Sequence, residues 1–325
     1  MSARIGIYGY GNLGRGVESE ITKNPDLQLA AIFTRRPPES LRARSGVPIV
    51  HESSAAEWEN QIDVMILCGG SANDLPAQGP KLAKSFNTVD SFDTHADIPS
   101  YFKSVDASAI AGNHISIVSV GWDPGLFSLL RLYAGAIIPN GHTYTFWGKG
   151  VSQGHSSAIR GIEGVVNAVQ YTVPVEDAMN RVRNGEMPEL AAGEKHLRVC
   201  YVAVTENADK QRIERDIQRM PNYFADYDTT VHFVTNDELE ATHGKLTHGG
   251  NVIHMGTTGD MNNQAIELSL KLDSNPEFTA SILLAYARAA YRLSIKGEHG
   301  ARTVFDIPPI LLTRMAEKDA VRNLL

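Results

Sequence analysis

Hydrophobic residues in the first 120 positions occur in short, uninterrupted runs rich in β-branched side chains, and amphipathic segments separate these runs. Such runs are typical of strands buried on both faces of a parallel sheet. They predict strands at 4–9, 27–33, 63–69, 87–92 and 114–120, and the segments between them predict helices at 13–24, 53–60, 74–85 and 97–111. Asp74 and Asp97 are the expected N-caps of the last two helices. The alternation predicts a doubly wound α/β domain.

The pattern changes after residue 140, where the predicted strands are longer. We expect them at 142–148, 165–173, 195–205, 229–235 and 264–273, with helices at 176–184 and 207–219. In the last strand one face carries Ile266, Leu268, Leu270 and Leu272, and the other carries Glu267, Ser269 and Lys271. This alternation is typical of a sheet with one solvated face, so it indicates a mostly antiparallel α+β region. We therefore expect a first domain at 1–122, completed by about 276–325 with a helix at 276–297, and a second domain at 123–275.

Composition narrows the class of protein. Of the 325 residues, 42% are hydrophobic and 21% charged, as in ordinary globular domains. The net charge of −7 argues against nucleic acid or an anionic membrane as the main partner. The N-terminus runs almost directly into a strand and lacks the layout of a signal peptide, and no apolar stretch is long enough to span a bilayer. Cys68 and Cys200 lie in apolar runs without metal-type spacing, so we expect buried thiols, no disulfide, no metal and a cytoplasmic location.

The segment "IYGYGNLGRG" (7–16) contains G-x-G-x-x-G between a predicted strand and a predicted helix, which is the context of a dinucleotide site. Gly9 would allow the tight turn, Gly11 the approach of the backbone to a pyrophosphate, and Gly14 close helix–strand packing. The free N–H groups of the helix start favour phosphates. The expected cofactor-binding residues here are Gly9, Tyr10, Gly11, Asn12, Leu13 and Gly14. The alternative is a structural turn that binds nothing.

The end of the second strand, "IFTRRP", distinguishes between the two nicotinamide cofactors. An NAD site usually places an acidic residue there to bind the ribose 2′-hydroxyl, whereas this chain has Thr34, Arg35 and Arg36. Guanidinium groups bind phosphate in a bidentate way, so these residues predict NADP(H). The alternative is a solvated basic turn. The loop after the third strand is expected to line the nicotinamide, through Cys68, Gly69, Gly70 and Ser71.

Candidate substrate residues follow the next two strands. Asp93 and Asp123 stand at adjacent strand ends, where ligands of doubly wound folds bind, and together they suit an ammonium group. Each could instead cap a turn. In the second domain Arg198 shares an otherwise apolar strand face, so it requires an anion, either a protein carboxylate or a ligand carboxylate. Thr172 and His248 add polar donors.

Several segments taken together resemble the meso-diaminopimelate D-dehydrogenase family over about residues 4–311. The most specific are "SVGWDPGLFS" and "TFWGKGVSQGHS", and others are "FTRRP", "CGGSANDLPAQGP", "DSFDTHADIP", "AVQYTVP", "MPNYF", "HGGNVI" and "KLDSNPEFTAS". The resemblance implies a homodimer with a Rossmann dinucleotide-binding domain and a second, substrate-binding and dimerisation domain. It also implies NADP-dependent, reversible deamination of the D-centre of meso-2,6-diaminopimelate, in the formation of lysine and cell-wall precursors. The products are L-2-amino-6-oxopimelate, which cyclises to tetrahydrodipicolinate, and ammonia.

The resemblance also assigns roles to individual residues. Asp93 and Asp123 would carry out the proton transfers, without a choice between them. The implied substrate-binding residues are Trp122, Trp147, Gln153, Gly154, Thr172, Arg198, His248 and Asn275. Of these, Trp147 would lie with the two aspartates around the D-centre, and Gln153 and Gly154 along the substrate chain. The distal L-centre would be held by Thr172, Arg198, His248 and Asn275.

Two departures from the family pattern lie in the substrate region. Ser157 replaces the acid in "SQGHSD", and the loop 244–247 reads "GKLT" before His248, where the family commonly has a Met-Pro pair. These departures leave the cofactor and the reaction type untouched but weaken the expectation of strict specificity for the meso compound. The alternatives are an NADP-dependent dehydrogenase of broader D-amino acid specificity and an NADP(H)-binding sensor without turnover.

Overall fold

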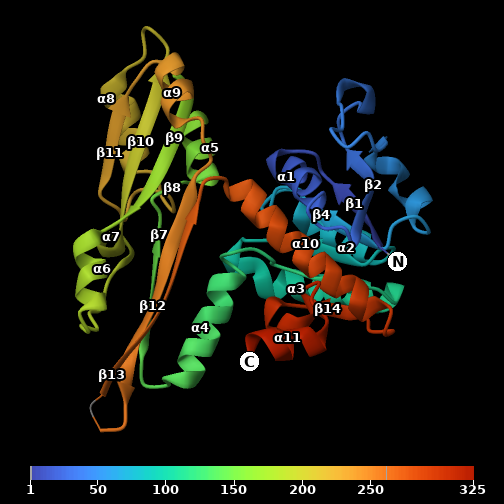
Figure 1. The fold of residues 1–325 in the computed structure, drawn as a ribbon. Helices are drawn as coiled ribbons and strands as arrows, with labels where there is room; N and C mark the ends of the chain where they lie inside the picture. Colours follow the sequence, from blue (N-terminus) through green and yellow to red (C-terminus); the bar gives the residue numbers. More distant parts are fainter. Residues whose placement is uncertain (1, 261) are drawn as a thin grey trace. The chain divides into compact units, whose positions relative to one another are not determined.

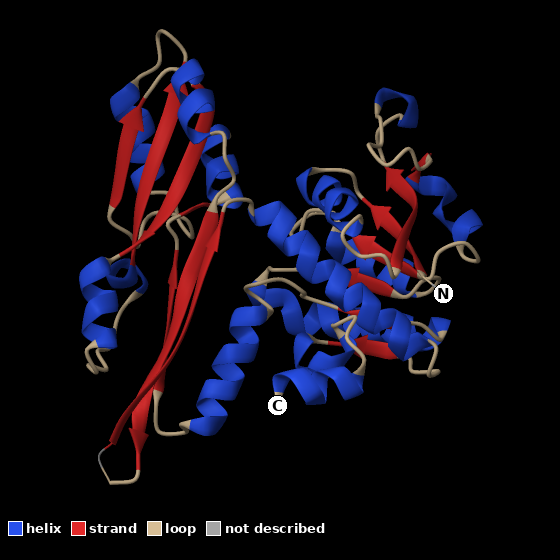
Figure 2. Cartoon of the chain, viewed as in Figure 1, coloured by secondary structure: helices blue, strands red, loops and turns tan. Residues whose placement is uncertain are grey.

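The computed structural model describes residues 2–260 and 262–325, and the chain divides into two compact units (Figures 1 and 2). Unit 1 comprises Met1–Leu129 and Pro276–Leu325, and unit 2 comprises Leu130–Asn275. No helix in the described chain combines the length and the apolar character that crossing a bilayer requires.

Unit 1 is built on one parallel sheet of order β14-β6-β5-β4-β1-β2-β3. Its strands are β1 (Ala3–Tyr8), β2 (Leu27–Thr34), β3 (Ile49–His51), β4 (Val64–Leu67), β5 (Thr88–Asp90), β6 (Ile115–Ile117) and β14 (Gly300–Arg302). Its helices are α1 (Asn12–Ile21), α2 (Leu75–Ala83), α3 (Ile98–Gly112), α10 (Asn275–Ser294) and α11 (Glu317–Leu324). The strand order reverses between β1 and β4, which is the position where doubly wound folds bind ligands. The predicted Rossmann-type sheet is confirmed.

The unbroken apolar runs follow from burial on both sheet faces. On one face Ile5 and Ile7 of β1 pack with Val17 of α1 and Leu283 of α10. On the other face Tyr8 belongs to the cluster that the side chains of α2 and α3 complete. Because adjacent residues of a strand point to opposite faces, a strand with helices on both sides has no solvated position to alternate with.

Unit 2 contains a four-stranded sheet of order β11-β10-β9-β8 and a three-stranded sheet of order β13-β12-β7. The strands are β7 (His142–Trp147), β8 (Gly150–Val151), β9 (Val165–Pro174), β10 (His196–Val204), β11 (Thr229–Phe233), β12 (His248–Thr258) and β13 (Asn262–Leu272). The helices are α5 (Gln153–Arg160), α6 (Glu176–Arg183), α7 (Ala192–Lys195), α8 (Lys210–Gln218) and α9 (Asn236–His243), and α4 (Leu126–Ile137) leads into the unit. All pairings are antiparallel except β10 with β11, so the predicted mostly antiparallel sheets are confirmed.

Several local expectations were wrong. Residues 52–58 form 3-10 turns instead of an α-helix, and the strand β12 was not predicted at all. Asp74 and Asp97 occupy the N-cap positions of α2 and α3, but neither side chain makes a capping hydrogen bond. Cys200 is buried as expected, whereas Cys68 is only partly buried.

Candidate active site

The glycine turn between β1 and α1 has the geometry that its spacing predicts. Gly9 has a φ of +101°, which favours glycine, and a Cβ on Gly14 would lie 2.1 Å from the Gly9 carbonyl oxygen. A Cβ on Gly11, by contrast, would meet no atom within 4 Å. Gly11 precedes the first turn of α1, whose N–H groups have no partner inside the helix. The turn therefore combines open space with backbone donors, and these features suit a pyrophosphate.

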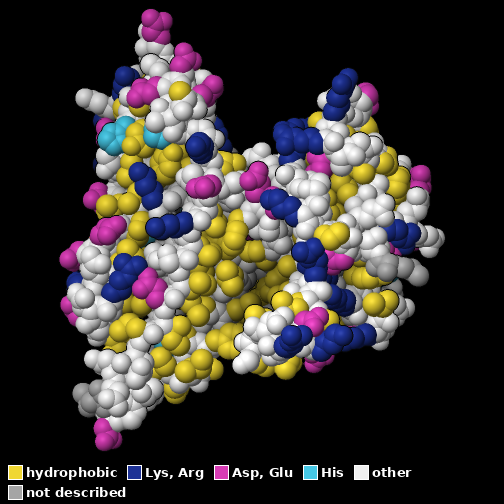
Figure 3. All heavy atoms as spheres, viewed as in Figure 1, with side chains coloured by type: hydrophobic (Ala, Val, Ile, Leu, Met, Phe, Trp, Pro, Cys, Tyr) yellow, Lys and Arg dark blue, Asp and Glu magenta, His cyan; other side chains and the backbone are white. Residues whose placement is uncertain are grey.

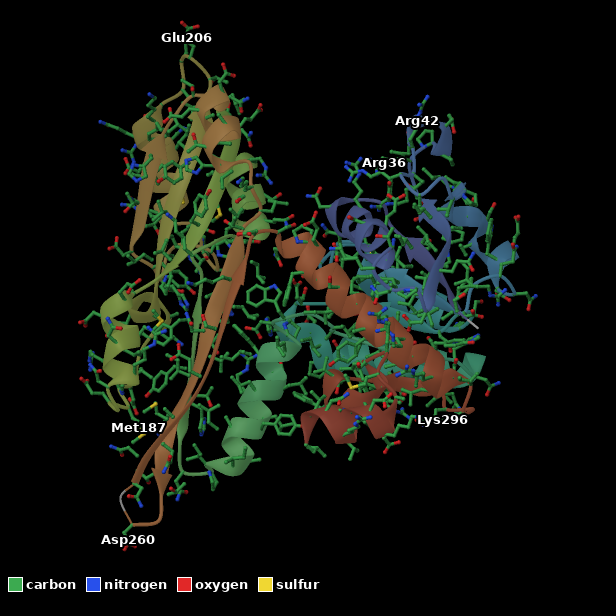
Figure 4. All side chains as sticks on the ribbon, in the orientation of Figure 1. Arg36, Arg42, Met187, Glu206, Asp260 and Lys296 are labelled. Carbon is green, nitrogen blue, oxygen red and sulfur yellow. The ribbon has the colours of Figure 1, made fainter. Side chains whose placement is uncertain are left out.

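A buried carboxylate ties this turn to the segment that follows β2. Glu18 of α1 accepts hydrogen bonds from the Tyr10 hydroxyl at 2.5 Å and from the Ser45 backbone N–H at 2.8 Å. Burial by itself would raise the pKa of Glu18, but these bonds outweigh it and the pKa lies below its usual value. Arg36 donates to the Tyr10 carbonyl oxygen at 2.5 Å. These hydrogen bonds hold the segment that follows β2 against the glycine turn. This segment is basic, and Figure 4 shows Arg36 and Arg42 on it.

The other predicted phosphate ligands lie at the end of β2, where no acidic residue stands. Thr34 is buried, and its hydroxyl accepts a hydrogen bond from the Arg36 backbone N–H. Arg35 forms a two-point ion pair with Asp74, at 2.8 and 3.3 Å. The Asp74 carboxylate also accepts from the Gly70 backbone N–H at 2.8 Å, which explains why it does not cap α2. Asp74 was not predicted as the partner of Arg35, because the two residues lie in different loops.

The loop after β4 connects the cofactor side of unit 1 to Asp93. The Cys68 backbone N–H bonds to the Tyr8 carbonyl, so this loop, which includes Gly69, starts beside the glycine turn. The Ser71 hydroxyl accepts from the Asp93 backbone N–H at 2.8 Å and also contacts Thr94. The Asp93 side chain itself is exposed.

Trp122 and Asp123 lie in a tight turn after β6. Trp122 is buried and its ring meets Phe127 edge-on at 5.4 Å. The peptide bond between Asp123 and Pro124 is cis. Gly125 has a φ of +131°, and a Cβ there would lie 1.8 Å from the Gly121 carbonyl, so only glycine fits. The "GWDPG" motif is thus a compact turn that fixes where the half-buried Asp123 emerges.

In unit 2 the structure buries Arg198 without an acidic partner. One of its guanidinium nitrogens donates a hydrogen bond to the Thr172 hydroxyl across the β9–β10 pair. The guanidinium also lies over the Tyr227 ring, 3.9 Å from its centroid. Its Nε is buried with no hydrogen-bond partner, and within residues 2–260 and 262–325 no carboxylate forms an ion pair with it. Burial lowers the pKa of Arg198. Of the two explanations that the sequence left open, the protein ion pair is wrong.

Two histidines near this guanidinium are neutral. Burial, followed by the Arg198 charge, lowers the pKa of His155 and of His196 to about 4. His196 accepts a hydrogen bond from the Trp147 backbone N–H at 2.8 Å, and its ring stacks on Trp147 at 5.1 Å. His155 contacts the Ser152 hydroxyl at 2.7 Å. Neither histidine was predicted. For His196 the sequence held a signal, because it lies two residues before Arg198 on β10, whereas His155 comes from α5 and is brought near by the fold.

His248 and Thr172 approach each other through Gly150. Gly150 pairs with Thr172 in the sheet, and a Cβ on it would lie 2.5 Å from the His248 imidazole. Burial lowers the pKa of His248. The Asn275 backbone N–H bonds to the Leu246 carbonyl at 2.9 Å, which places the start of α10 beside the loop before His248.

The remaining predicted residues lie at the start of α5. Gln153 and Gly154 are its first two residues, both exposed, and Ser152 is its N-cap. Ser157, one turn further on, is exposed as well. The predicted residues therefore form two sets: one follows the carboxyl ends of the unit 1 strands, and the other surrounds Arg198 in unit 2.

The donor set shows no sign of a metal centre, because no group of three or more His, Cys, Asp or Glu side chains among the described residues has metal-binding geometry. The side chains of these two sets suit the recognition of phosphate, carboxylate and ammonium groups.

Comparisons with known proteins agree with these features. A family model described as the diaminopimelic acid dehydrogenase C-terminal domain matches residues 121–274. The meso-diaminopimelate D-dehydrogenase of Ureibacillus thermosphaericus is 58% identical over 322 residues, with 99% of both chains covered. The structure of C. glutamicum DAP dehydrogenase in complex with DAP has a TM-score of 0.93 at 42% identity, covering 100% of this chain and 99% of that one. An engineered D-amino acid dehydrogenase bound to NADP+ has a TM-score of 0.90 at 42% identity, covering both chains completely. The chain therefore belongs to the meso-diaminopimelate D-dehydrogenase family.

Proposed function

We propose that this protein catalyses the NADP-dependent oxidative deamination of the D-centre of meso-2,6-diaminopimelate, reversibly, to L-2-amino-6-oxopimelate and ammonia. The observation that carries the proposal is Arg198, a buried guanidinium paired with Thr172 and Tyr227 and with no protein carboxylate. A buried charge of this kind requires an anion, and a substrate with a distal carboxylate supplies one. A cofactor sensor without turnover has no need of such a group.

NADP(H) fits unit 1 on its own geometry. The backbone N–H groups at 11–14 would bind the pyrophosphate, and Thr34, Arg35 and Arg36 the 2′-phosphate. Tyr10 would line the adenosine side, and the loop Cys68–Ser71 the nicotinamide. When bound, this cofactor supplies the hydride acceptor for Cα–H cleavage. The relative solved with NADP+ supports this choice over NAD.

Asp93 and Asp123 would bind the ammonium group at the D-centre and accept its proton. Hydride leaves Cα only after the amine has lost a proton, because its lone pair forms the new C=N bond. A carboxylate beside the nitrogen binds the ammonium and accepts that proton, directly or through water. Water then adds to the imine carbon, and the carbinolamine expels ammonia to leave the ketone. We propose that Trp122 and Trp147 cover this centre.

The unit 2 set would hold the L-centre and so determine which end of the substrate reacts. Arg198 and Thr172 would bind its carboxylate, and His248 and Asn275 its remaining polar groups, with Gln153 and Gly154 along the chain. Neutral histidines beside Arg198 leave its positive charge available to an anion. Fixed orientation of this kind contributes to catalysis because it presents only the D-centre hydrogen for transfer.

A substrate panel tests the proposal. The purified protein is given NADP+ with meso-, LL- or DD-diaminopimelate, or with D-lysine or D-alanine, and NADPH absorbance is followed. We expect turnover of the meso compound and none of the LL isomer. Faster turnover of D-lysine or D-alanine would replace the proposal with a broader D-amino acid dehydrogenase. Absence of NADPH with every compound would favour the sensor.

We further propose that the chain works as a homodimer in the cytoplasm. Leu132, Tyr133 and Ile137 of α4 are each more than half exposed, and Figure 3 shows hydrophobic side chains gathered over β12, β13 and α4. Exposed apolar patches of this kind mark interfaces. The double variant Leu132→Glu/Ile137→Glu should elute as a monomer in size-exclusion chromatography with light scattering, whereas a wild-type monomer would contradict the proposal.

A further inference from the structure

A buried carboxylate that the mechanism does not use lies directly between the two proposed catalytic loops. Asp90, the last residue of β5, has no exposed surface. One of its oxygens accepts from the Phe92 backbone N–H and from the Ser119 backbone N–H, both at 3.0 Å. Its own carbonyl accepts from the Val120 backbone N–H at 2.8 Å. Phe92 is adjacent to Asp93 in the chain, and Ser119 begins the segment that leads to Asp123.

The second oxygen of Asp90 is fixed as well. It accepts from the Tyr101 hydroxyl at 2.8 Å, and the Tyr101 ring stacks on Phe92 with centroids 4.1 Å apart. A Cβ on Gly79 of α2 would lie 2.1 Å from that hydroxyl, so glycine is required there for the contact to form. Both oxygens are therefore held, and the carboxylate has no freedom to contact a substrate.

The Ser119 backbone depends strongly on its hydrogen bond to Asp90. Its φ of +57° is in the left-handed region, which non-glycine residues rarely adopt, and its buried hydroxyl has no hydrogen-bond partner. The surrounding structure has to stabilise such a conformation, and the hydrogen bond to Asp90 is the contact that reaches the Ser119 backbone.

We propose that Asp90 is a positioning residue, which holds the Asp93 loop and the Asp123 loop in one fixed arrangement for proton transfer. The inference rests on the roles given to these two aspartates under the proposed function. A single carboxylate oxygen shared by both loops sets their separation, and a displacement of about 1 Å in a reacting group costs roughly a hundredfold in rate.

A series of variants tests the proposal. Asp90→Leu removes the shared acceptor, and we expect kcat for meso-diaminopimelate to fall about a hundredfold while the Kd for NADP+, measured by fluorescence, changes less than about threefold. Asp90→Asn keeps an acceptor oxygen for both N–H groups and should restore kcat to within about tenfold of wild type. Adding Ser119→Gly to Asp90→Leu should recover part of the lost kcat, because glycine adopts the left-handed conformation without support.

Thr88→Val is the matched control. Thr88 is buried on the same strand and donates to the Ser116 hydroxyl at 2.8 Å, away from both loops. Its loss should lower the Tm and leave kcat unchanged. Hydrogen exchange at the amides of Phe92 and Ser119 gives a readout without substrate: we expect faster exchange in Asp90→Leu and no change in Thr88→Val.

Two results would overturn the inference. In one, folded Asp90→Leu retains more than about a third of the wild-type kcat; in the other, its kcat and its NADP+ binding fall together in proportion to the unfolded fraction. If Asp90→Leu does not fold, the inference is tested instead with the kcat of Asp90→Leu/Ser119→Gly and with the amide exchange rates of Asp90→Asn. Unchanged kcat in both Asp93→Asn and Asp123→Asn would instead refute the proposed catalytic roles, whatever the Asp90 variants do.

Discussion

The guanidinium carbon of Arg198 lies 3.9 Å from the centroid of the Tyr227 ring, so an aromatic face covers one side of a buried positive charge. The ring compensates part of the cost of burying that charge, since a cation over an aromatic face gains about 1–2 kcal/mol when desolvated. It supplies no negative charge. The arrangement holds the cation in place and leaves it able to bind an anion.

Replacing Arg198 should weaken the binding of substrates that carry a distal carboxylate and spare those that lack one. We expect Arg198→Met to raise the KM for meso-diaminopimelate about a hundredfold, because the loss of a buried charged partner for a carboxylate costs up to about 3 kcal/mol. The KM for D-alanine, which has no distal carboxylate, should change little. Steady-state kinetics with both substrates measure the difference. Arg219→Met, at an exposed position of the same unit, is the control. Equal losses for both substrates would show that Arg198 is only structural.

The arginine pair after β2 should determine the choice between NADP+ and NAD+. In the variant Arg35→Ala/Arg36→Ala we expect the KM for NADP+ to rise roughly a hundredfold and the KM for NAD+ to change much less, since two charge-assisted phosphate contacts are lost. Arg181→Ala, which removes an exposed arginine of unit 2, should leave both values unchanged. An unaltered NADP+/NAD+ preference in the double variant would mean that "FTRRP" is a solvated basic turn.

The parallel sheet was the part of the fold that the sequence predicted best, for a physical reason. Strands covered on both faces must be apolar throughout, so runs such as that of β1 are visible without any knowledge of their partners. β12 was missed because Gly249, Gly250 and Gly256 interrupt its apolar run, and its place between β7 and β13 depends on tertiary pairing. α4 was missed because its residues are nearly all apolar or glycine, and such a run is compatible with a buried strand as well as with a helix.

The stability of the protein should fall in mild acid partly because of His196. Its pKa of about 4 lies below the unfolded value of about 6.5, so the unfolded state binds the proton more tightly. This contribution is fully present above pH 6.5 and is lost as the pH falls toward 4, by about 2–3 kcal/mol. The free energy of unfolding from denaturant titrations at pH 7.5, 5.5 and 4.5 measures it.

The matched variant for this test is His196→Gln, which cannot be protonated. Its free energy of unfolding should depend less on pH than that of the wild type, by about 2 kcal/mol between pH 7.5 and 4.5. Parallel pH profiles for the two proteins would show that His196 does not titrate as its burial predicts.

The two proposed catalytic carboxylates should affect turnover and not cofactor binding. We expect Asp93→Asn and Asp123→Asn each to lower kcat by about 10²- to 10⁴-fold, the range for loss of a general acid or base, with the Kd for NADP+ unchanged. Asp97→Asn is a close control, because Asp97 lies on the same segment as Asp93 and makes no capping hydrogen bond. If only one aspartate variant loses activity, that residue alone moves the proton.

The site was predictable where the chemistry is local and was missed where it depends on packing. The glycines stand in one short stretch with recognisable spacing, and the two arginines stand side by side in another, at the end of a predictable strand. Tyr227 and His155 come from segments far from Arg198 in the sequence, and only the fold brings them to it. His196 lies two residues before Arg198 on β10, but its low pKa depends on the burial of that strand. Asp74 looks like a simple helix cap in the sequence, and its ion pair with Arg35 depends on two loops meeting.

Isotope transfer shows which of the two stereocentres of the substrate loses its hydrogen. The enzyme is given NADP+ and meso-diaminopimelate carrying deuterium only at Cα of the D-centre, and the NADPH formed is analysed by mass spectrometry. Oxidation of the D-centre predicts one deuterium in the reduced nicotinamide and none at the new ketone carbon. Unlabelled NADPH, with the deuterium retained in an amino acid product, would show that the L-centre reacts and would contradict the proposed orientation.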